Sequence, residues 1–224
     1  MKLLKALAPA WIALAVYVAF VLWVRTRLPE TPIAVHFNGH LQPDRYQPRD
    51  AALFQPLVVV AAILAILTVA PFVMPPKGAL ERSAKAYGAT CFAIIACVCI
   101  VLSGIAFRAL NWPIGMAQLL SVSLGLLFAV MGNFLTKVRP NFIYGVRTPW
   151  TLANERVWDR THRVAGPAMM AGGLFVLVAG LIWPAKVMLF VLVGVGPVLL
   201  TIPYSWWLWS KLPPDEKRRV RIGA

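Results

Sequence analysis

Six long apolar stretches alternate with polar segments along the 224 residues of the chain. A helix needs about 20 apolar residues to cross a bilayer core about 30 Å thick. Each stretch approaches or reaches that length without an Asp, Glu, Lys, Arg or His. The pattern predicts an all-α membrane protein with six transmembrane helices, at Leu7–Val24, Leu53–Met74, Ala89–Phe107, Ile114–Leu135, Pro167–Trp183 and Val187–Trp209.

The first apolar stretch follows the basic sequence MKLLK, as the apolar part of a signal peptide would. Its apolar run is long for a signal peptide, and no small-x-small cleavage site follows it. We therefore expect a retained first span. The longest polar segments, residues 25–52 and 136–166, are too short to bury cores of their own, so the chain is expected to form a single integral membrane domain over residues 1–224.

Basic residues are divided unevenly between the two sides that six spans would create. The N-terminus, the second and fourth loops and the C-terminal tail hold 16 of the 22 Lys and Arg residues, and the other three loops hold 6. The positive-inside bias predicts that both termini are cytoplasmic. We expect the protein to lie in the inner membrane of the cell. Trp23, Trp112 and Trp183 fall at span ends on the opposite side, where aromatic belts occur.

Composition supports the membrane assignment and narrows the partners. Hydrophobic residues make up 60% of the chain and charged residues 13%, against roughly a quarter charged in soluble domains. The net charge of +14 follows from topology and from attraction to anionic lipid head groups on the inner leaflet, so no nucleic acid is expected. Cys97 and Cys99 point about 200° apart on a helix and, with Cys91, favour apolar packing over a metal site.

The outer loop, residues 25–52, contains four prolines that forbid a long helix. Residues 31–37 are suited to a short extended segment, and Asn38-Gly39 is a strong turn signal. This sequence predicts a hairpin or capping loop over the outer face.

A histidine-rich spacing in the outer loop raises the question of a metal site. His36, His40 and Asp44 are four residues apart and would share one face of a helix. Gly39 and Pro43 disfavour that helix, so we expect no metal there and a locally hydrogen-bonded His36. His36, Asn38 and Asp44 are the candidate functional residues of this loop.

The inner loop, residues 136–166, is basic and broken by proline and glycine. Arg139-Pro140-Asn141 predicts an extended or turned backbone, and Gly145 predicts a second turn. Thr151 is a candidate N-cap for a short amphipathic cytoplasmic helix over residues 152–164, lying along the membrane. On it, one stripe would carry Arg156, Arg160 and Arg163, and the adjacent face Trp158, Thr161, His162 and Ala165.

Two interpretations of the inner loop remain open. It is either an anchor that holds spans four and five in register, or a recognition surface for an anion, peptide or protein. On the second interpretation Arg139 and Arg147 would hold a carboxylate or phosphate, and Trp150 and Trp158 would anchor the loop at the interface. The candidate residues here are Asn133, Lys137, Arg139, Pro140, Asn141, Gly145, Arg147, Thr148, Pro149, Trp150, Trp158, Thr161, His162 and Arg163.

These residues resemble the signature of the SdpI family of bacterial membrane proteins. The resemblance rests on Gly132-Asn133, Lys137-x-Arg139-Pro140-Asn141, Gly145-x-Arg147-Thr148-Pro149-Trp150-Thr151-Leu152, Val157-Trp158 and Thr161-His162-Arg163-x-x-Gly166. In the outer loop, Leu28-Pro29, Pro32, His36-Phe37-Asn38 and Pro43-Asp44 are similar to the family's extracytoplasmic loop. Ala34 stands where the family commonly has proline, and Arg45 or Arg49 would replace its lysine.

The resemblance implies a multi-pass immunity protein, because the namesake of the family protects against a secreted killing-factor peptide toxin. It implies a peptide toxin as the outer partner. It also implies a cytoplasmic regulator as the inner partner, since the namesake is thought to hold a repressor at the membrane.

Two other classes of function remain as alternatives. A small transporter or channel is one, with Pro197 and Pro203 opening the last span, although no span carries an ionisable residue at mid-depth. A membrane-surface enzyme is the other, with His162 paired to Asp159 as its acid–base group. No nucleophile or metal-ligand pattern accompanies that pair, so we expect no enzyme and no cofactor.

Overall fold

The computed structural model describes residues 2–38, 43–73 and 80–217. Within these residues, six helical segments are long and apolar enough to cross a membrane, which confirms the predicted six spans. They are α1 (Lys2–Arg27), α2 (Arg49–Val73), η1 with α3 (Glu81–Ser83 and Ala84–Ala109), α4 (Met116–Leu135), α6 (Glu155–Ile182), and η2, α7 and α8 (Pro184–Lys186, Val187–Leu199 and Thr201–Ser210).

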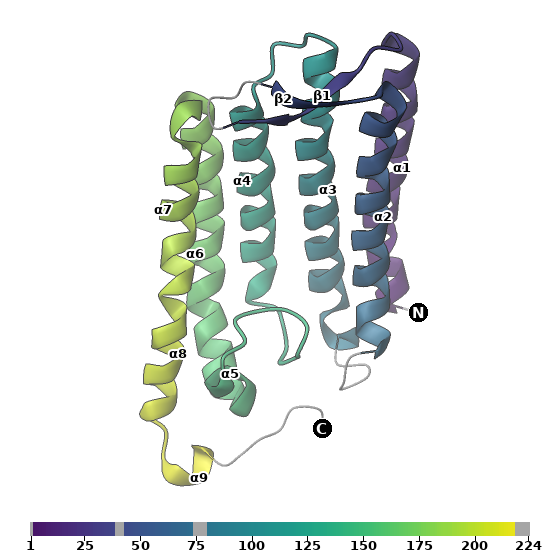
Figure 1. The fold of residues 1–224 in the computed structure, drawn as a ribbon. Helices are drawn as coiled ribbons and strands as arrows, with labels where there is room; N and C mark the ends of the chain where they lie inside the picture. Colours follow the sequence, from purple (N-terminus) through teal and green to yellow (C-terminus); the bar gives the residue numbers. More distant parts are fainter. Residues whose placement is uncertain (1, 39–42, 74–79, 218–224) are drawn as a thin grey trace.

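The spans form a row in which each helix packs on its neighbours (Figure 1). α1 and α2 pack on α3, α3 on α4, α4 on α6, and α6 on α7 and α8. The start of α1 lies at the same end of the bundle as two short helices, α5 (Pro149–Ala153) and α9 (Pro214–Lys217). Large apolar side chains such as Val58, Ile66 and Leu192 are exposed on the outside. This surface is suited to lipid. Which compartment each end faces stays a prediction.

Glycines bring α4 and α6 into close contact at two levels. A Cβ added at Gly132 would lie 2.6 Å from the carbonyl oxygen of Gly166, and one added at Gly173 would lie 2.7 Å from that of Gly125. Gly125 and Gly132 are seven residues apart on α4, and Gly166 and Gly173 are seven residues apart on α6. This spacing is about two helical turns. Small residues at such spacing let membrane helices approach backbone to backbone. This glycine spacing is present in the sequence and was not part of the predictions made from it.

The predicted separate amphipathic helix over residues 152–164 is wrong. Residues 155–182 form one continuous helix, and the N-cap of α6 is Asn154 instead of Thr151. Pro167 cannot donate to the carbonyl of Arg163, but it does not end the helix. The helix continues because Trp158, which precedes the proline in α6, and Gly173, which follows it, are both buried against neighbouring segments.

The last span is divided into two helical segments just before Pro203. α7 ends at Leu199 and α8 begins at Thr201, with Leu200 between them. Pro203 lacks the N–H that would bond to the carbonyl of Leu199, and its ring crowds that oxygen. The predicted span is therefore present, but as two helical segments.

The predicted outer hairpin is present. β1 (Ile33–Phe37) pairs antiparallel with β2 (Pro43–Gln47), and Ile33 faces Gln47 across the ladder. The hairpin lies across the end of the bundle opposite α5 and α9 (Figure 1). The predicted turn at Asn38-Gly39 and residue His40 fall at or within residues 39–42, which lie outside the described residues.

Candidate functional site

The connection between α4 and α6, residues 136–154, is organised around the side chain of Asn141. This side chain is 1% exposed. Its Oδ1 accepts from the backbone N–H groups of Ile143 and Tyr144, at 2.8 and 2.9 Å, and its Nδ2 donates to the carbonyl of Arg139 at 2.8 Å. One amide thus satisfies three backbone groups that have no helix to pair them, and the extended or turned backbone predicted at residues 139–141 is confirmed.

Trp158 and His162 form a stacked pair beneath the connection. Their ring centroids are 4.1 Å apart, and both side chains are buried. Trp158 Nε1 donates to the carbonyl of Val138 at 2.7 Å. The prediction that Trp158 anchors the loop in the membrane interface is therefore wrong. Its indole instead ties the start of α6 to the end of α4 through a buried hydrogen bond.

The histidine of this pair is held in one protonation state by its backbone partners. His162 Nε2 lies 3.0 Å from the N–H of Val146, and Nδ1 lies 2.8 Å from the carbonyl of Trp158. Because an amide N–H only donates and a carbonyl only accepts, Nε2 is the acceptor and Nδ1 carries the proton. The ring is neutral. Both nitrogens are engaged, so the acid–base pair suggested with Asp159 does not form.

Gly145 is required by this arrangement. Its φ is +118°, a backbone conformation that residues with a side chain rarely adopt. An added Cβ would lie 2.6 Å from His162 Nε2 and 3.2 Å from the Trp158 ring. The predicted turn at Gly145 is thus also the place where the connection passes directly over the stacked pair.

Two threonines start α5 and attach it to the last span. The hydroxyl of Thr148 accepts from the Thr151 N–H at 3.2 Å, and the Thr151 hydroxyl accepts from the Thr148 N–H at 2.9 Å. Thr148 Oγ1 also lies 3.0 Å from the hydroxyl of Ser205 in α8. Thr148 is therefore the N-cap, with Pro149 following at the first helical position.

The start of α6 is bound to the C-terminal segment. Asn154 Oδ1 caps the helix by accepting from the N–H groups of Arg156 and Val157, and its Nδ2 donates to the carbonyl of Glu216 at 3.1 Å. Arg156 forms an ion pair with the Glu216 carboxylate at 3.2 Å. Sequence analysis missed both Asn154 and Glu216, although an Asn directly before Glu155 is a recognisable cap.

The basic candidates of the inner loop lie on the surface. The N–H of Arg139 donates to Ser83 Oγ at 2.9 Å, and the guanidinium of Arg147 donates to the carbonyl of Phe142. Lys137 stacks over the ring of Phe134 at 5.1 Å. The proposed anion binding by Arg139 and Arg147 stays a prediction.

The remaining candidates occupy varied positions. Arg163 and Asn133 are exposed, and Pro140 and Trp150 are half-buried. Thr161 is buried, and no hydrogen-bond partner of its hydroxyl is present among the described residues.

In the outer hairpin, His36 Nδ1 lies 2.6 Å from a carboxylate oxygen of Asp44. The expected local bonding of His36 is confirmed, and the contact joins the two strands. Asn38 is half-buried at the end of β1. Among the described residues, no group of three His, Cys, Asp or Glu side chains is placed to hold a metal ion.

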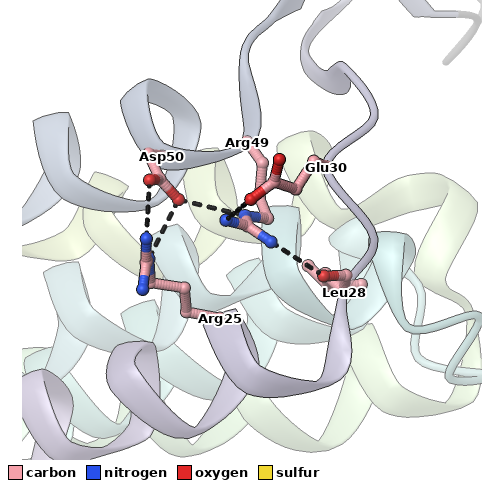
Figure 2. A network of polar contacts seen from close by, with 5 residues as sticks. All are labelled: Arg25, Leu28, Glu30, Arg49 and Asp50. Atoms are coloured by element: carbon pink, nitrogen blue, oxygen red, sulfur yellow. Dashed lines mark hydrogen bonds and ion pairs between the residues drawn. The ribbon is translucent and has the colours of Figure 1, made fainter.

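Arg49 fixes the hairpin to the bundle, as Figure 2 shows. Its side chain is 11% exposed and donates to the carbonyl of Leu28 at 3.1 Å, to Glu30 at 3.1 Å and to Asp50 at 3.0 Å. The carboxylate of Asp50 in turn accepts hydrogen bonds from Nε and from a terminal nitrogen of Arg25, at 3.0 and 2.9 Å. This network joins the end of α1, the segment leading to β1 and the start of α2.

Comparisons with known proteins point to the same part of the chain. Residues 137–205 match a model described as the SdpI/YfhL protein family. The immunity protein SdpI of Bacillus subtilis (strain 168) is 27% identical over 105 residues, which cover 46% of this chain and 50% of that protein. The matched segment thus spans half the length of that relative. No solved structure matches the chain significantly.

Proposed function

We propose that this chain, which belongs to the SdpI/YfhL family, is an inner-membrane immunity protein that protects its cell from an envelope-active peptide toxin. The observation that carries the proposal is the match of residues 137–205 to the family, together with the 27% identity to an immunity protein. The peptide toxin as the threat, a cytoplasmic regulator as a partner and the inner membrane as the location are all proposed here.

The outer hairpin is the part of the chain that suits a peptide ligand. β1 and β2 form a two-stranded sheet, so within the described residues each strand pairs on one side only. An extended peptide can add to such an edge through backbone hydrogen bonds. Tyr46, which is 59% exposed, provides an aromatic contact beside the strands. The Arg49 network holds this sheet against the bundle, so that binding at the hairpin would be felt by α1 and α2.

The α4–α6 connection has a different part in the proposal. Asn141 shapes the connection itself, and Trp158 and His162 of α6 attach it to that helix through Val138 and Val146. Its exposed basic groups, Arg139, Arg147 and Arg163, would form a docking surface for a cytoplasmic regulator. A toxin arriving at the hairpin would not reach this surface, because the connection lies at the opposite end of the bundle (Figure 1).

The test is survival of a sensitive strain that expresses the chain and is challenged with killing-factor peptides. We expect protection by the parent chain, and its loss when Tyr46→Ala is combined with His36→Ala. We expect Arg147→Ala to impair signalling to the regulator while membrane accumulation stays at the parental level. Arg45→Ala, also exposed on β2, is the matched control for the hairpin variant.

Two results would contradict the proposal. The first is no gain in survival against a panel of such toxins when the chain accumulates in the membrane. The second is equal loss of protection in the hairpin variant and in its Arg45→Ala control. If Arg147→Ala fails to accumulate, Arg147 has a structural role and the docking surface is not supported.

A further inference from the structure

A basic pocket of about 690 Å³ opens at the end of the bundle that holds the start of α1. It lies between the first turns of α1, the start of α3 with η1, and the end of α4, which meet at this end of the row (Figure 1). Its charged lining residues are Lys2, Lys5, Glu81, Arg82, Lys85 and Lys137. The motif residues of the α4–α6 connection contribute only Lys137.

The charge of the pocket is strongly unbalanced. Five basic residues line it with one acidic residue, Glu81. Within the described part of the chain, Lys2, Lys5 and Lys85 appear in none of the ion pairs. Cations gathered from three separate segments repel one another unless an anion lies between them.

The other wall of the pocket is apolar and firmly placed. Ala6, Ala84, Ala86 and Phe134 form it. Just beyond it α1 and α3 are in close contact, because a Cβ added at Gly88 would lie 2.7 Å from the carbonyl carbon of Ala6. A cationic rim beside an apolar wall at the level of a membrane interface is suited to an amphiphile with an anionic head. A freely diffusing anion would use only the rim.

We propose that this pocket binds a phosphate-bearing anion, and that its source is the head group of an anionic phospholipid. The phosphate would lie among the lysines of α1 and α3, with Lys137 beside it, and the first carbons of the acyl chains against Phe134. Basic pockets between membrane helices bind phospholipid head groups in this way. This binding does not depend on the proposed immunity function.

Native mass spectrometry of the detergent-solubilised chain tests the proposal, with phosphatidylglycerol and phosphatidylcholine as probes. The pocket variant combines Lys5→Gln with Lys85→Gln. The control combines Arg160→Gln with Lys211→Gln, which removes the same charge from exposed positions at the same end of the bundle. We expect the parent and the control to retain phosphatidylglycerol over phosphatidylcholine, and the pocket variant to bind it roughly tenfold more weakly or worse.

A second arm identifies the source of the phosphate. Thermal unfolding is followed with inorganic phosphate alone and with phosphatidylglycerol alone, and we expect only the lipid to stabilise the parent. Stabilisation by inorganic phosphate to the same extent, lost in the pocket variant, would overturn the lipid as source. Equal weakening in the pocket variant and its control would overturn the site, since it indicates diffuse surface attraction. Equal retention of the two lipids would overturn it as well.

Discussion

Replacing Gly145, the one glycine among residues 136–154, with alanine should disrupt the α4–α6 connection. The residue has a φ of +118°, and a Cβ would lie 2.6 Å from His162 Nε2. That nitrogen accepts the Val146 N–H at 3.0 Å. The methyl group therefore has to displace either the backbone turn or the imidazole, and both movements break this hydrogen bond.

The expected cost follows from two contributions. Holding a residue with a side chain in such a backbone conformation costs about 1–3 kcal/mol. Loss of the hydrogen bond between the Val146 N–H and the buried imidazole nitrogen of His162 costs about 1–3 kcal/mol more. Together they lower the free energy of unfolding by about 2–6 kcal/mol, in the upper part of the range for single substitutions.

The assay is equilibrium unfolding in mixed micelles of mild detergent and sodium dodecyl sulfate, with hydrogen exchange as a local probe. Gly145→Ala should unfold at lower denaturant and exchange the Val146 amide faster. Gly196→Ala is the matched control, because nothing beyond its chain neighbours and the nearby backbone of its own helix lies within 4 Å of the position of its Cβ. It should leave stability unchanged or slightly raised, since alanine favours a helix. Equal stability of Gly145→Ala and the parent, with Val146 still protected, would refute the reasoning.

Three further predictions concern other contacts. Trp158→Phe removes the donor to the buried carbonyl of Val138 and should cost about 1–3 kcal/mol in the same unfolding assay. Gly173→Ala introduces a Cβ 2.7 Å from the carbonyl oxygen of Gly125 and should separate α4 from α6, at about 1–3 kcal/mol. Arg49→Gln removes the contacts of a side chain that is 11% exposed. It should speed hydrogen exchange and proteolysis of the hairpin and lower the free energy of unfolding by about 1–3 kcal/mol.

Each of these has a matched control. Trp206→Phe changes an indole that is 51% exposed and should leave the unfolding midpoint in place. Gly196→Ala serves again for the helix contact, and Arg45→Gln on the exposed face of β2 serves for the hairpin. If a control changes its readout as much as its partner variant, the specific contact is not the cause.

The spans were predictable because the signal is local and additive. Each apolar stretch carries its own tendency to enter a membrane, whatever the rest of the chain does. The hairpin was predictable for a similar reason, since alternating apolar residues and an Asn-Gly turn act over a few positions. Boundaries were less certain, and α1 extends beyond the predicted Leu7–Val24 to Lys2–Arg27.

The inner loop was predicted correctly in part. The non-helical backbone at residues 139–141 and the turn at Gly145 follow from local backbone preferences. The N-cap predicted at Thr151 was wrong, because Thr148 caps α5 and Asn154 caps α6. The separate helix over residues 152–164 was wrong because Pro167 and the change from polar to apolar residues both suggested a boundary. The α6 helix continues through them because its buried face contacts α4 and the connection on both sides of the proline.

By itself, the sequence determined the number of spans, the position of the hairpin and the residues of the family signature. Only the tertiary structure decided what those residues contact. Trp158 meets a carbonyl twenty positions away in sequence, and Thr148 meets Ser205 in another span. The same holds for the basic pocket, whose lysines come from three segments. The backbone polar groups of a non-helical connection have to find partners among whatever lies nearby in space, and local sequence does not specify those neighbours.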